Sequence, residues 1–374
     1  MRINGHVASG FDKVASAFER NFLDHGDIGA SCSIYYQGKP VVDIWSGLAD
    51  PLAGKAWEED TIQLCFSASK GITTVCVLTL VQQGLLELDR PIADYWPEFG
   101  CEGKQGITTR MVLSHRAGLA AIDGDLTLPQ VLAWYPVVDA IARQKPNWEP
   151  DTAHGYHTRS FGWILGEIVR RISGKSLGKF MAAEVTGPLE ADFWIGLPES
   201  ELQRCARLMP DTNPLFGDFV PSSLTIQSLT GPSNLFSYND MWNDKALLMA
   251  EMPSSNGMGN GRSLAKLYVA MIGEIDGIRL LNADTLTEAC RVHSQGMDMI
   301  IPMETTFGLG FMLPPWLIRY ECGPRSFGHT GAGGSFAMAD PDRELSFGYV
   351  MNQMSMNPQD PRAVNLVKAM YESL

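Results

Sequence analysis

The sequence predicts an α/β (α+β) fold, in which an antiparallel sheet flanked by helices carries an inserted, mostly helical domain. Segments typical of strands lie near both ends of the chain, whereas the middle alternates short helical stretches with Pro- and Gly-rich turns. Strands from the two ends can share one sheet only if the middle is an insertion. We therefore expect residues 1–85 and 250–374 to form the sheet domain, and residues 86–249 to form a helical domain over the cleft.

The chain is long and apolar enough to bury a large core. It has 374 residues, of which 45% are hydrophobic and 19% charged. This composition excludes a disordered chain. A cleft between the sheet domain and the inserted domain is the expected place for a site.

The first 45 residues predict a helix followed by a β-hairpin. Four apolar residues recur at the spacing of one helix face: Phe11, Val14, Phe18 and Phe22. Residues 30–36 and 41–45 are typical of two strands, and residues 37–40 of the turn between them.

The next element is a predicted helix from Ala68 to Gln83, which ends before Gly84. It is too apolar to lie on the surface, and the short apolar segment 62–66 leads into it. Further along, three more helices are predicted at residues 159–172, 262–272 and 361–371. The last part is rich in predicted strands, at residues 307–313, 326–330, 334–339 and 345–352.

The first chemical motif is Ser67-Ala68-Ser69-Lys70, an S-x-x-K. Residues three apart lie on one helix face, so the lysine amine can reach the serine hydroxyl and act as its base if burial lowers the lysine pKa. A serine at a helix N-terminus also has a free backbone N–H that can hold an oxyanion. Two other matches, at residues 176–179 and 263–266, follow polar turns and fit helix-capping serines instead.

Two further motifs carry polar groups that suit the same chemistry. Tyr156-His157-Thr158 offers a phenol that can relay a proton, although a half-buried tyrosine with its hydroxyl in water is the simpler interpretation of this motif alone. The segment from His329 to Gly334 offers glycines and a strand edge for close substrate approach and a second oxyanion donor. It lacks the Gly-Lys-Ser/Thr of a P-loop.

In this order, the three motifs resemble those of the serine β-lactamase-like superfamily, which includes class C β-lactamases and penicillin-binding proteins. The resemblance runs from about Phe18 to the C-terminus. Within the superfamily the chain is most similar to family VIII carboxylesterases. The other segments that carry the resemblance are residues 29–30, 43–47, 95–99, 112–119, 161–168, 188–189 and 328–331.

The resemblance implies a β-lactamase/transpeptidase-like fold and a role for each motif residue. Ser67 would form an acyl-enzyme, and Lys70 and Tyr156 would share general-base and proton-relay duty. The backbone N–H groups of Ser67 and Ala332 would form the oxyanion hole. His329, Thr330 and Gly331 would bind substrate, and neither a metal nor an organic cofactor is implied.

Two departures from the β-lactamase pattern favour an esterase over a β-lactamase, and short-chain acyl esters are the expected substrates. Thr158 replaces the usual Asn or Ser, and His329 replaces a lysine that would help to bind a β-lactam carboxylate. A β-lactamase or D-amino-acid peptidase, an acyltransferase and a non-catalytic binding protein of the same fold remain alternatives.

Charge and cysteine content set the expected partners. The formal net charge of −13 disfavours nucleic acid, and no apolar run is long enough to span a membrane. Seven cysteines without a C-x-x-C pair, and no apolar signal core at the N-terminus, predict a cytoplasmic protein. His154 and His157 have no third ligand at helical spacing, so no metal site is expected. The expected partner is a small-molecule ester, and a homo-oligomer stays possible.

Overall fold

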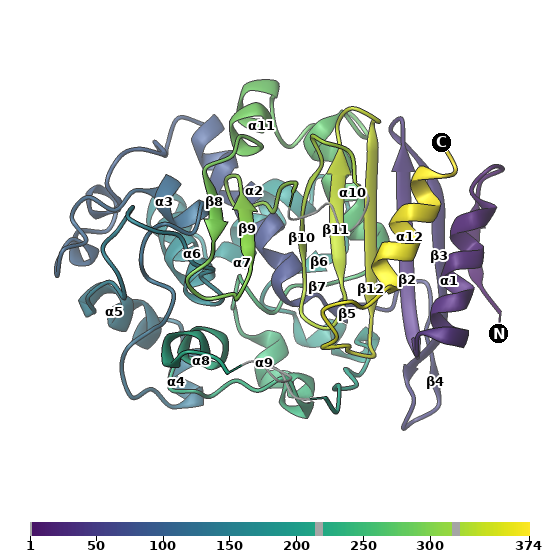
Figure 1. The fold of residues 1–374 in the computed structure, drawn as a ribbon, viewed down its shortest axis with the longest axis horizontal. Helices are drawn as coiled ribbons and strands as arrows, with labels where there is room; N and C mark the ends of the chain where they lie inside the picture. The colour runs from purple at the N-terminus through teal and green to yellow at the C-terminus, as the bar shows by residue number, and fades with distance from the viewer. Residues whose placement is uncertain (1, 214–219, 316–321) are drawn as a thin grey trace.

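A computed structural model describes residues 2–213, 220–315 and 322–374, and its central sheet joins the two ends of the chain (Figure 1). The strand order is β1-β3-β2-β12-β11-β10, with neighbouring strands antiparallel and β4 paired to the far end of β3. The strands are β1 (Asn4–Val7), β2 (Gly29–Tyr36), β3 (Lys39–Asp50), β4 (Lys55–Ala56), β10 (Phe327–Thr330), β11 (Phe336–Asp340) and β12 (Leu345–Met351). The pairing of β2 with β12 makes the sheet continuous and confirms the predicted fold class.

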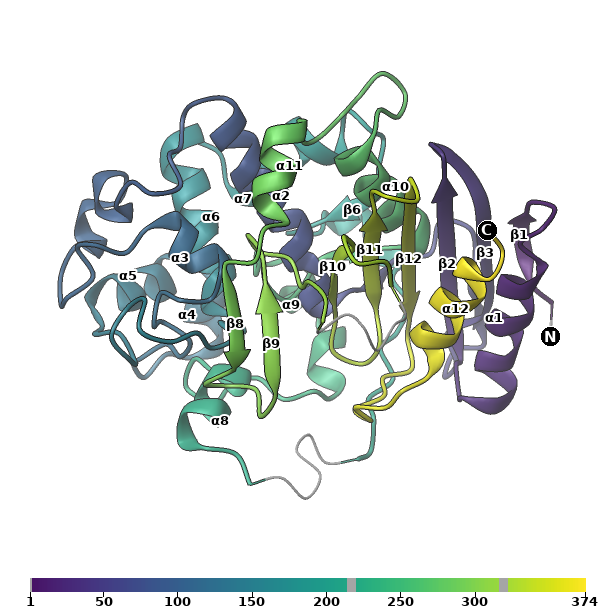
Figure 2. The same ribbon diagram turned by 45° about the horizontal axis from the view of Figure 1, so that its top comes forward.

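Helices cover both faces of this sheet. The helices α1 (Asp12–Asp24) and α12 (Arg362–Tyr371) pack together on one face, and α10 (Gly261–Ile272) packs on the other (Figures 1 and 2). Successive side chains of β12 point to opposite faces of the sheet, as the pleat of a strand requires. Phe347 and Tyr349 point toward α1 and α12, whereas a β-carbon at Gly348 would lie 2.3 Å from the backbone oxygen of Gly261 on α10.

The middle of the chain is mostly helical and lies beyond β10, on the side of the molecule away from β1 (Figure 1). Its longer helices are α5 (Tyr135–Arg143), α6 (Ser160–Ser173) and α8 (Ser223–Thr230). Its shorter helices are α3 (Thr109–Leu113), α4 (Leu128–Leu132), α7 (Leu177–Met181) and α9 (Lys245–Met249). The boundaries near residues 85 and 250 stay a prediction.

Helix α2 (Ser69–Gln82) runs through the interior between these parts and packs against α6, α7 and β10. Every residue from Ser69 to Leu78 is buried, as the apolar character of the segment predicted. In the described ranges, no helix has both the length and the hydropathy that a membrane crossing needs.

Two predicted elements differ from the structure. The chain was predicted to open with a helix, but it opens with the edge strand β1. The residues of β1 are partly exposed and lack the alternation of apolar and polar residues that predicts a strand. A strand was predicted at residues 307–313, but the strand in the structure, β9, is Glu304–Phe307 and pairs with β8 (Ser294–Met297). The predicted strand therefore begins at the residue where β9 ends. The chain turns at Gly310, where φ is +71° and a β-carbon would overlap Thr74 of α2.

Candidate active site

The hydroxyl of Ser67 lies on a tight turn just before α2. Residues 66–68 form one turn of 3₁₀ helix, in which Ser67 is half-exposed while Phe66 and Ala68 are buried. Phe66 has a φ of +46°, an unfavourable conformation for a residue with a side chain. The Ser69 hydroxyl donates to the Phe66 carbonyl and accepts the N–H of Gly257 at 2.8 Å, which holds the turn in place.

The amine of Lys70 is buried completely beneath this serine. Its Nζ lies 3.1 Å from Ser67 Oγ, 2.7 Å from the Thr158 carbonyl oxygen and 3.2 Å from the Ser254 carbonyl oxygen. A neutral amine has two N–H bonds and one lone pair. With both N–H bonds directed at the two carbonyls, the lone pair is left for the serine hydroxyl.

The surroundings of Lys70 favour this neutral form. Burial lowers the pKa of Lys70 well below its usual value, and the positive charge of Arg159 lowers the pKa further. The polar and aromatic groups around the amine come from three parts of the fold: the segment with Tyr156 and Arg159, His115, and His329. The Tyr156 ring centroid lies 4.7 Å from Nζ. Among the described residues, no carboxylate acts on Lys70 to restore its charge.

The phenol of Tyr156 lies over the same pair and is hydrogen-bonded to the Ser67 side chain. Burial raises the pKa of Tyr156, and the bond to Ser67 opposes that rise only in part. The tyrosine is held through its backbone, since its N–H donates to Asp298 Oδ1 at 3.0 Å. The N–H of the next residue, His157, donates to Nδ1 of His115 at 3.0 Å, and the ring of His115 packs against the tyrosine.

The third residue of this motif acts through its backbone. The Thr158 hydroxyl turns toward α8 and bonds Ser228 at 3.0 Å, while its carbonyl accepts from Lys70. At this position the motif therefore offers the lysine a backbone acceptor, while the threonine hydroxyl is engaged with Ser228.

The loop after β10 packs directly against the turn that carries Ser67. The Ser335 hydroxyl donates to the Cys65 carbonyl at 2.7 Å, and the Gly331 N–H donates to the Ser335 carbonyl at 2.7 Å. Ser67, Gly331 and Ala332 are all partly exposed. Within the described part of the chain, the N–H groups of Ser67 and Ala332 make no hydrogen bond.

His329 lies inside the protein, and Thr330, Gly331 and Ala332 form the accessible surface of this loop. The imidazole is 1% exposed, and its Nδ1 donates to the Thr330 carbonyl at 2.7 Å. Its ring centroid lies 6.0 Å from that of Tyr156. Burial, with a smaller effect of Lys70, lowers the pKa of His329 to about 3, so the ring is neutral at pH 7.

The two histidines of the H-x-x-H pair make separate contacts. Nε2 of His154 lies 3.0 Å from Thr305 Oγ1, whereas His157 accepts the N–H of Leu119 at 2.9 Å. In the ranges that the structure describes, no group of three His, Cys, Asp or Glu side chains could hold a metal ion.

Two charged residues that support the site were not predicted from the sequence. Arg159 is 3% exposed and has no carboxylate partner among the described residues; it bonds the Leu229 carbonyl at 2.9 Å and lies 4.4 Å from the Phe236 ring centroid. Asp298 is 8% exposed and accepts three backbone N–H groups. Asp298 is a single acidic residue within the apolar run 297–303, and this pattern could have indicated a buried carboxylate. For Arg159, the only indication in the sequence is its position next to the tyrosine motif.

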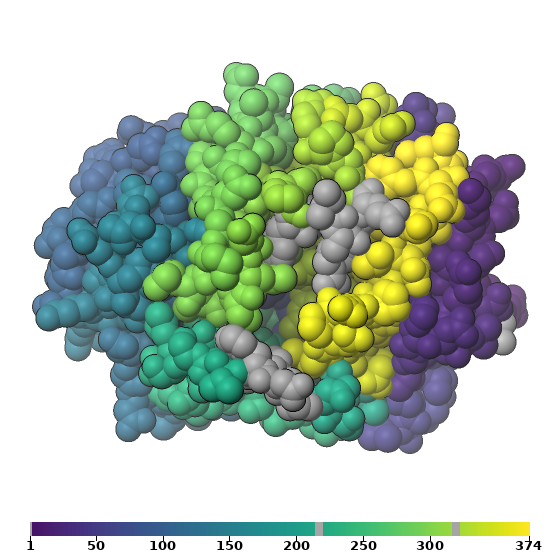
Figure 3. All heavy atoms as spheres, viewed as in Figure 1, coloured from purple at the N-terminus to yellow at the C-terminus, as the bar shows by residue number. Residues whose placement is uncertain are grey.

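Asp298 lies on the turn after β8, so the hairpin of β8 and β9 contributes directly to the position of Tyr156. Figure 3 shows this hairpin (green) between the middle of the chain (blue and teal) and the C-terminal segment (yellow). Three parts of the chain that are distant in sequence thus meet around one serine.

Comparisons with known proteins agree with the fold. The family model described as Beta-lactamase matches residues 15–369. The Esterase/beta-lactamase LipL of Mycobacterium tuberculosis is 29% identical over 94% of this chain and 83% of its own length. A crystal structure of a family VIII carboxylesterase is 37% identical, with a TM-score of 0.93 over 100% of both chains. A penicillin-binding protein homolog from Caulobacter crescentus is 34% identical, with a TM-score of 0.92 over 100% of both chains.

Proposed function

The chain belongs to the beta-lactamase family, and from this premise we propose that it is a serine hydrolase that cleaves carboxylic esters through an acyl-enzyme on Ser67. The observation that carries the proposal is the set of contacts of Lys70. Two carbonyls occupy its N–H bonds, burial favours the uncharged amine, and Ser67 Oγ lies 3.1 Å from Nζ. A serine hydroxyl becomes a competent nucleophile when such a base removes its proton.

In the acylation step, Nζ of Lys70 takes the proton of Ser67 while Oγ forms a bond to the ester carbonyl carbon. The carbonyl oxygen gains the negative charge, and the unoccupied N–H groups of Ser67 and Ala332 receive it. When the tetrahedral intermediate collapses, the C–O bond to the alcohol breaks. The alcohol leaves with the proton, which Tyr156 passes on from Lys70.

In the deacylation step, a water molecule replaces the alcohol. Lys70 and Tyr156 remove its proton as its oxygen attacks the acyl carbon, and the proton returns to Ser67 Oγ as the acid product leaves. Both steps use the same three side chains, because each half-reaction is the other run in reverse with a different hydroxyl.

Esters are the proposed substrates because the site offers no cation for a substrate carboxylate at position 329. His329 is buried and neutral, and Thr158 turns its hydroxyl toward α8. The carboxylesterase structure and the Esterase/beta-lactamase LipL support an ester substrate, and the name of LipL makes β-lactams the second class to test.

Intact-mass measurement after mixing with an activated ester, such as p-nitrophenyl acetate, tests the proposal. We expect one acyl group on the wild type and none on Ser67→Ala. Ser176→Ala is the matched control, because Ser176 is the serine of another S-x-x-K match and its hydroxyl caps α7. An adduct on Ser67→Ala, or hydrolysis that this variant retains, would overturn the mechanism.

Rates with p-nitrophenyl acetate, nitrocefin and a D-alanyl amide then rank the substrate classes. Faster turnover of nitrocefin or the amide would replace the ester proposal with a β-lactamase or peptidase. Transfer products formed with added alcohols or amines would identify an acyltransferase. A wild type that is not labelled by a fluorophosphonate would point to a binding protein.

A further inference from the structure

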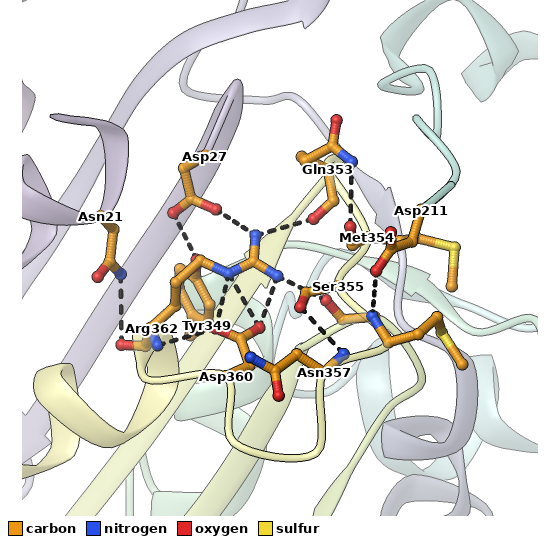
Figure 4. A network of polar contacts seen from close by, with 12 residues as sticks. Asn21, Asp27, Asp211, Tyr349, Gln353, Met354, Ser355, Asn357, Asp360 and Arg362 are labelled. Atoms are coloured by element: carbon orange, nitrogen blue, oxygen red, sulfur yellow. Dashed lines mark hydrogen bonds and ion pairs between the residues drawn. The ribbon is translucent and has the colours of Figure 1, made fainter. Parts of the chain in front are cut away.

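A buried arginine at the start of α12 connects four separate parts of the chain (Figure 4). Arg362 is 1% exposed, and all five of its N–H bonds have acceptors. Nε and one Nη2 hydrogen are directed at the Asp360 carboxylate, and one Nη1 hydrogen at Asp27 Oδ1, at 2.7 Å. The Gln353 carbonyl accepts the second Nη1 hydrogen at 2.8 Å.

The fifth N–H bond reaches the loop of the proposed oxyanion hole. Nη2 of Arg362 donates to the carbonyl oxygen of Gly333 at 2.8 Å, one residue after Ala332. The same oxygen accepts the N–H of Ser355 at 3.0 Å. The loop therefore lies between the Cys65 carbonyl on one side and this guanidinium on the other.

Two of the three glycines in the loop, Gly333 and Gly334, leave space beside this contact. A β-carbon at Gly334 would lie 3.1 Å from Arg362 Nη2, and one at Gly333 would lie 2.9 Å from Met354 Cγ. Both glycines have positive φ angles, +85° and +125°. Gly333 occupies the third position of a turn that the Gly334 N–H closes onto the Gly331 carbonyl, where a type II turn needs a positive φ.

We propose that Arg362 is a positioning residue for catalysis, which fixes the loop that presents the Ala332 N–H to the substrate oxyanion. This inference rests on the function proposed above. Arg362 does not touch the substrate; it acts through the Gly333 carbonyl. A lysine would supply charge to Asp27 and Asp360 but would lack the planar fork that makes the five contacts together.

The test compares Arg362→Lys with Tyr349→Phe. The hydroxyl of Tyr349 donates to Asp27 Oδ2 at 2.5 Å, so its removal damages the same network without touching Gly333. We expect kcat for p-nitrophenyl acetate to fall by about 10- to 100-fold in Arg362→Lys, the range that a small misplacement of catalytic groups causes, with KM changed by less than about threefold. Tyr349→Phe should keep kcat within about twofold.

Two further readouts separate positioning from a general loss of stability. A boronic acid that forms a tetrahedral adduct on Ser67 should bind Arg362→Lys more weakly by the same factor as the fall in kcat. Hydrogen exchange of the segment 331–335 should quicken in Arg362→Lys and not in Tyr349→Phe. If Arg362→Lys does not fold, Asp360→Asn replaces it in the test. This variant keeps the guanidinium but weakens the hydrogen bond that Asp360 accepts from Nη2, so a smaller fall in kcat and a smaller rise in exchange rate are expected.

A folded Arg362→Lys with wild-type kcat, boronate affinity and exchange would overturn the inference, as would equal losses in Tyr349→Phe. Failure of the proposed function has a different signature, namely no ester hydrolysis by the wild type or full activity in Ser67→Ala. Hydrogen exchange still decides whether Arg362 holds the loop in that case, because it requires no turnover.

Discussion

The missing side chain of Gly331 lets the loop after β10 reach the carbonyl oxygen of Cys65, and a β-carbon on Gly331 would lie only 2.1 Å from that oxygen. The Ser335 hydroxyl, which bonds the same carbonyl, would also lie 2.1 Å from that β-carbon. Since Cys65 directly precedes the turn that carries Ser67, the spacing between Ser67 and Ala332 depends on this glycine.

Gly331→Ala should therefore abolish most activity while the Ser67 hydroxyl stays in place. Backbone must move to relieve the overlap, and displacement of the oxyanion donors costs on the order of 100-fold in kcat. Ester hydrolysis measures the effect. Gly106→Ala is the control, since its β-carbon would meet no atom within 4 Å; equal activity of the two variants would contradict the proposed role of the loop.

Arg159 should set the acid limb of the pH–rate profile through its charge. In the proposed mechanism Lys70 acts as a base only when neutral, so kcat/KM should fall as the pH drops through the pKa of Lys70. Burial lowers that pKa first, and the nearby Arg159 cation lowers it further. Arg159→Met removes the cation, which raises the pKa of Lys70 and moves the acid limb to higher pH.

Arg159→Lys keeps the charge and should leave the acid limb close to that of the wild type. Both variants lose the guanidinium that donates twice to the Leu229 carbonyl, so a structural effect would lower the rate of both across the whole pH range. A profile from pH 5 to pH 10 with p-nitrophenyl acetate distinguishes the two effects. An unmoved acid limb in Arg159→Met would refute the electrostatic role.

Asp298 should hold Tyr156 in place without touching the substrate. Its Oδ1 accepts the N–H groups of Tyr156, Ile300 and Ile301, and unsatisfied buried donors cost about 1–3 kcal/mol each. Asp298→Ala should lower the unfolding free energy by roughly 3 kcal/mol and reduce kcat about tenfold or more.

Asp298→Asn retains an oxygen for those three N–H groups and should recover most of kcat. Asp125→Ala removes an exposed carboxylate and is the neutral control. Denaturant unfolding and ester kinetics measure the two effects separately. Equal kcat for the Ala and Asn variants would show that the oxygen acceptor at position 298 does not govern the tyrosine.

Buried neutral histidines should make the fold sensitive to mild acid. Burial lowers the pKa of His329 to about 3 and that of His157 to about 4, against an ordinary value of 6.5. Below pH 6.5 these histidines bind protons in the unfolded chain but stay unprotonated in the folded chain. The free energy of unfolding therefore falls as the pH drops toward the pKa values of the folded state. At pH 5 each histidine contributes a loss of roughly 2 kcal/mol.

His329→Gln should reduce the dependence of stability on pH, because glutamine does not titrate. Unfolding in urea at pH 7 and pH 5 gives the difference in free energy for each variant. His25→Gln, at a partly exposed histidine near the end of α1, provides the comparison and should keep the wild-type dependence. An unchanged pH dependence in His329→Gln would show that this ring is protonated in the folded protein.

Much of the site could be predicted because its first motif is local. A serine and a lysine three residues apart share a helix face whatever the rest of the chain does, and the structure places their polar atoms 3.1 Å apart. The strands β2, β3, β10, β11 and β12 and the apolar helix α2 followed from their periodicity and composition in the same way, whereas β1 did not. The turn at Gly310 did not, because what fills the space beside it is Thr74, from another part of the chain.

By itself, the sequence determined which groups could react and on which kinds of element they stand. Tertiary structure alone decided their surroundings and spacing: the burial and the Arg159 charge that lower the pKa of Lys70, the carbonyl of Thr158 in place of its hydroxyl, and the bond from Arg362 to Gly333. The physical reason is the distance along the chain over which each interaction acts. Helical and strand periodicity depend on neighbours a few residues away, whereas desolvation, charge interaction and backbone hydrogen bonds between loops depend on residues that only folding brings together.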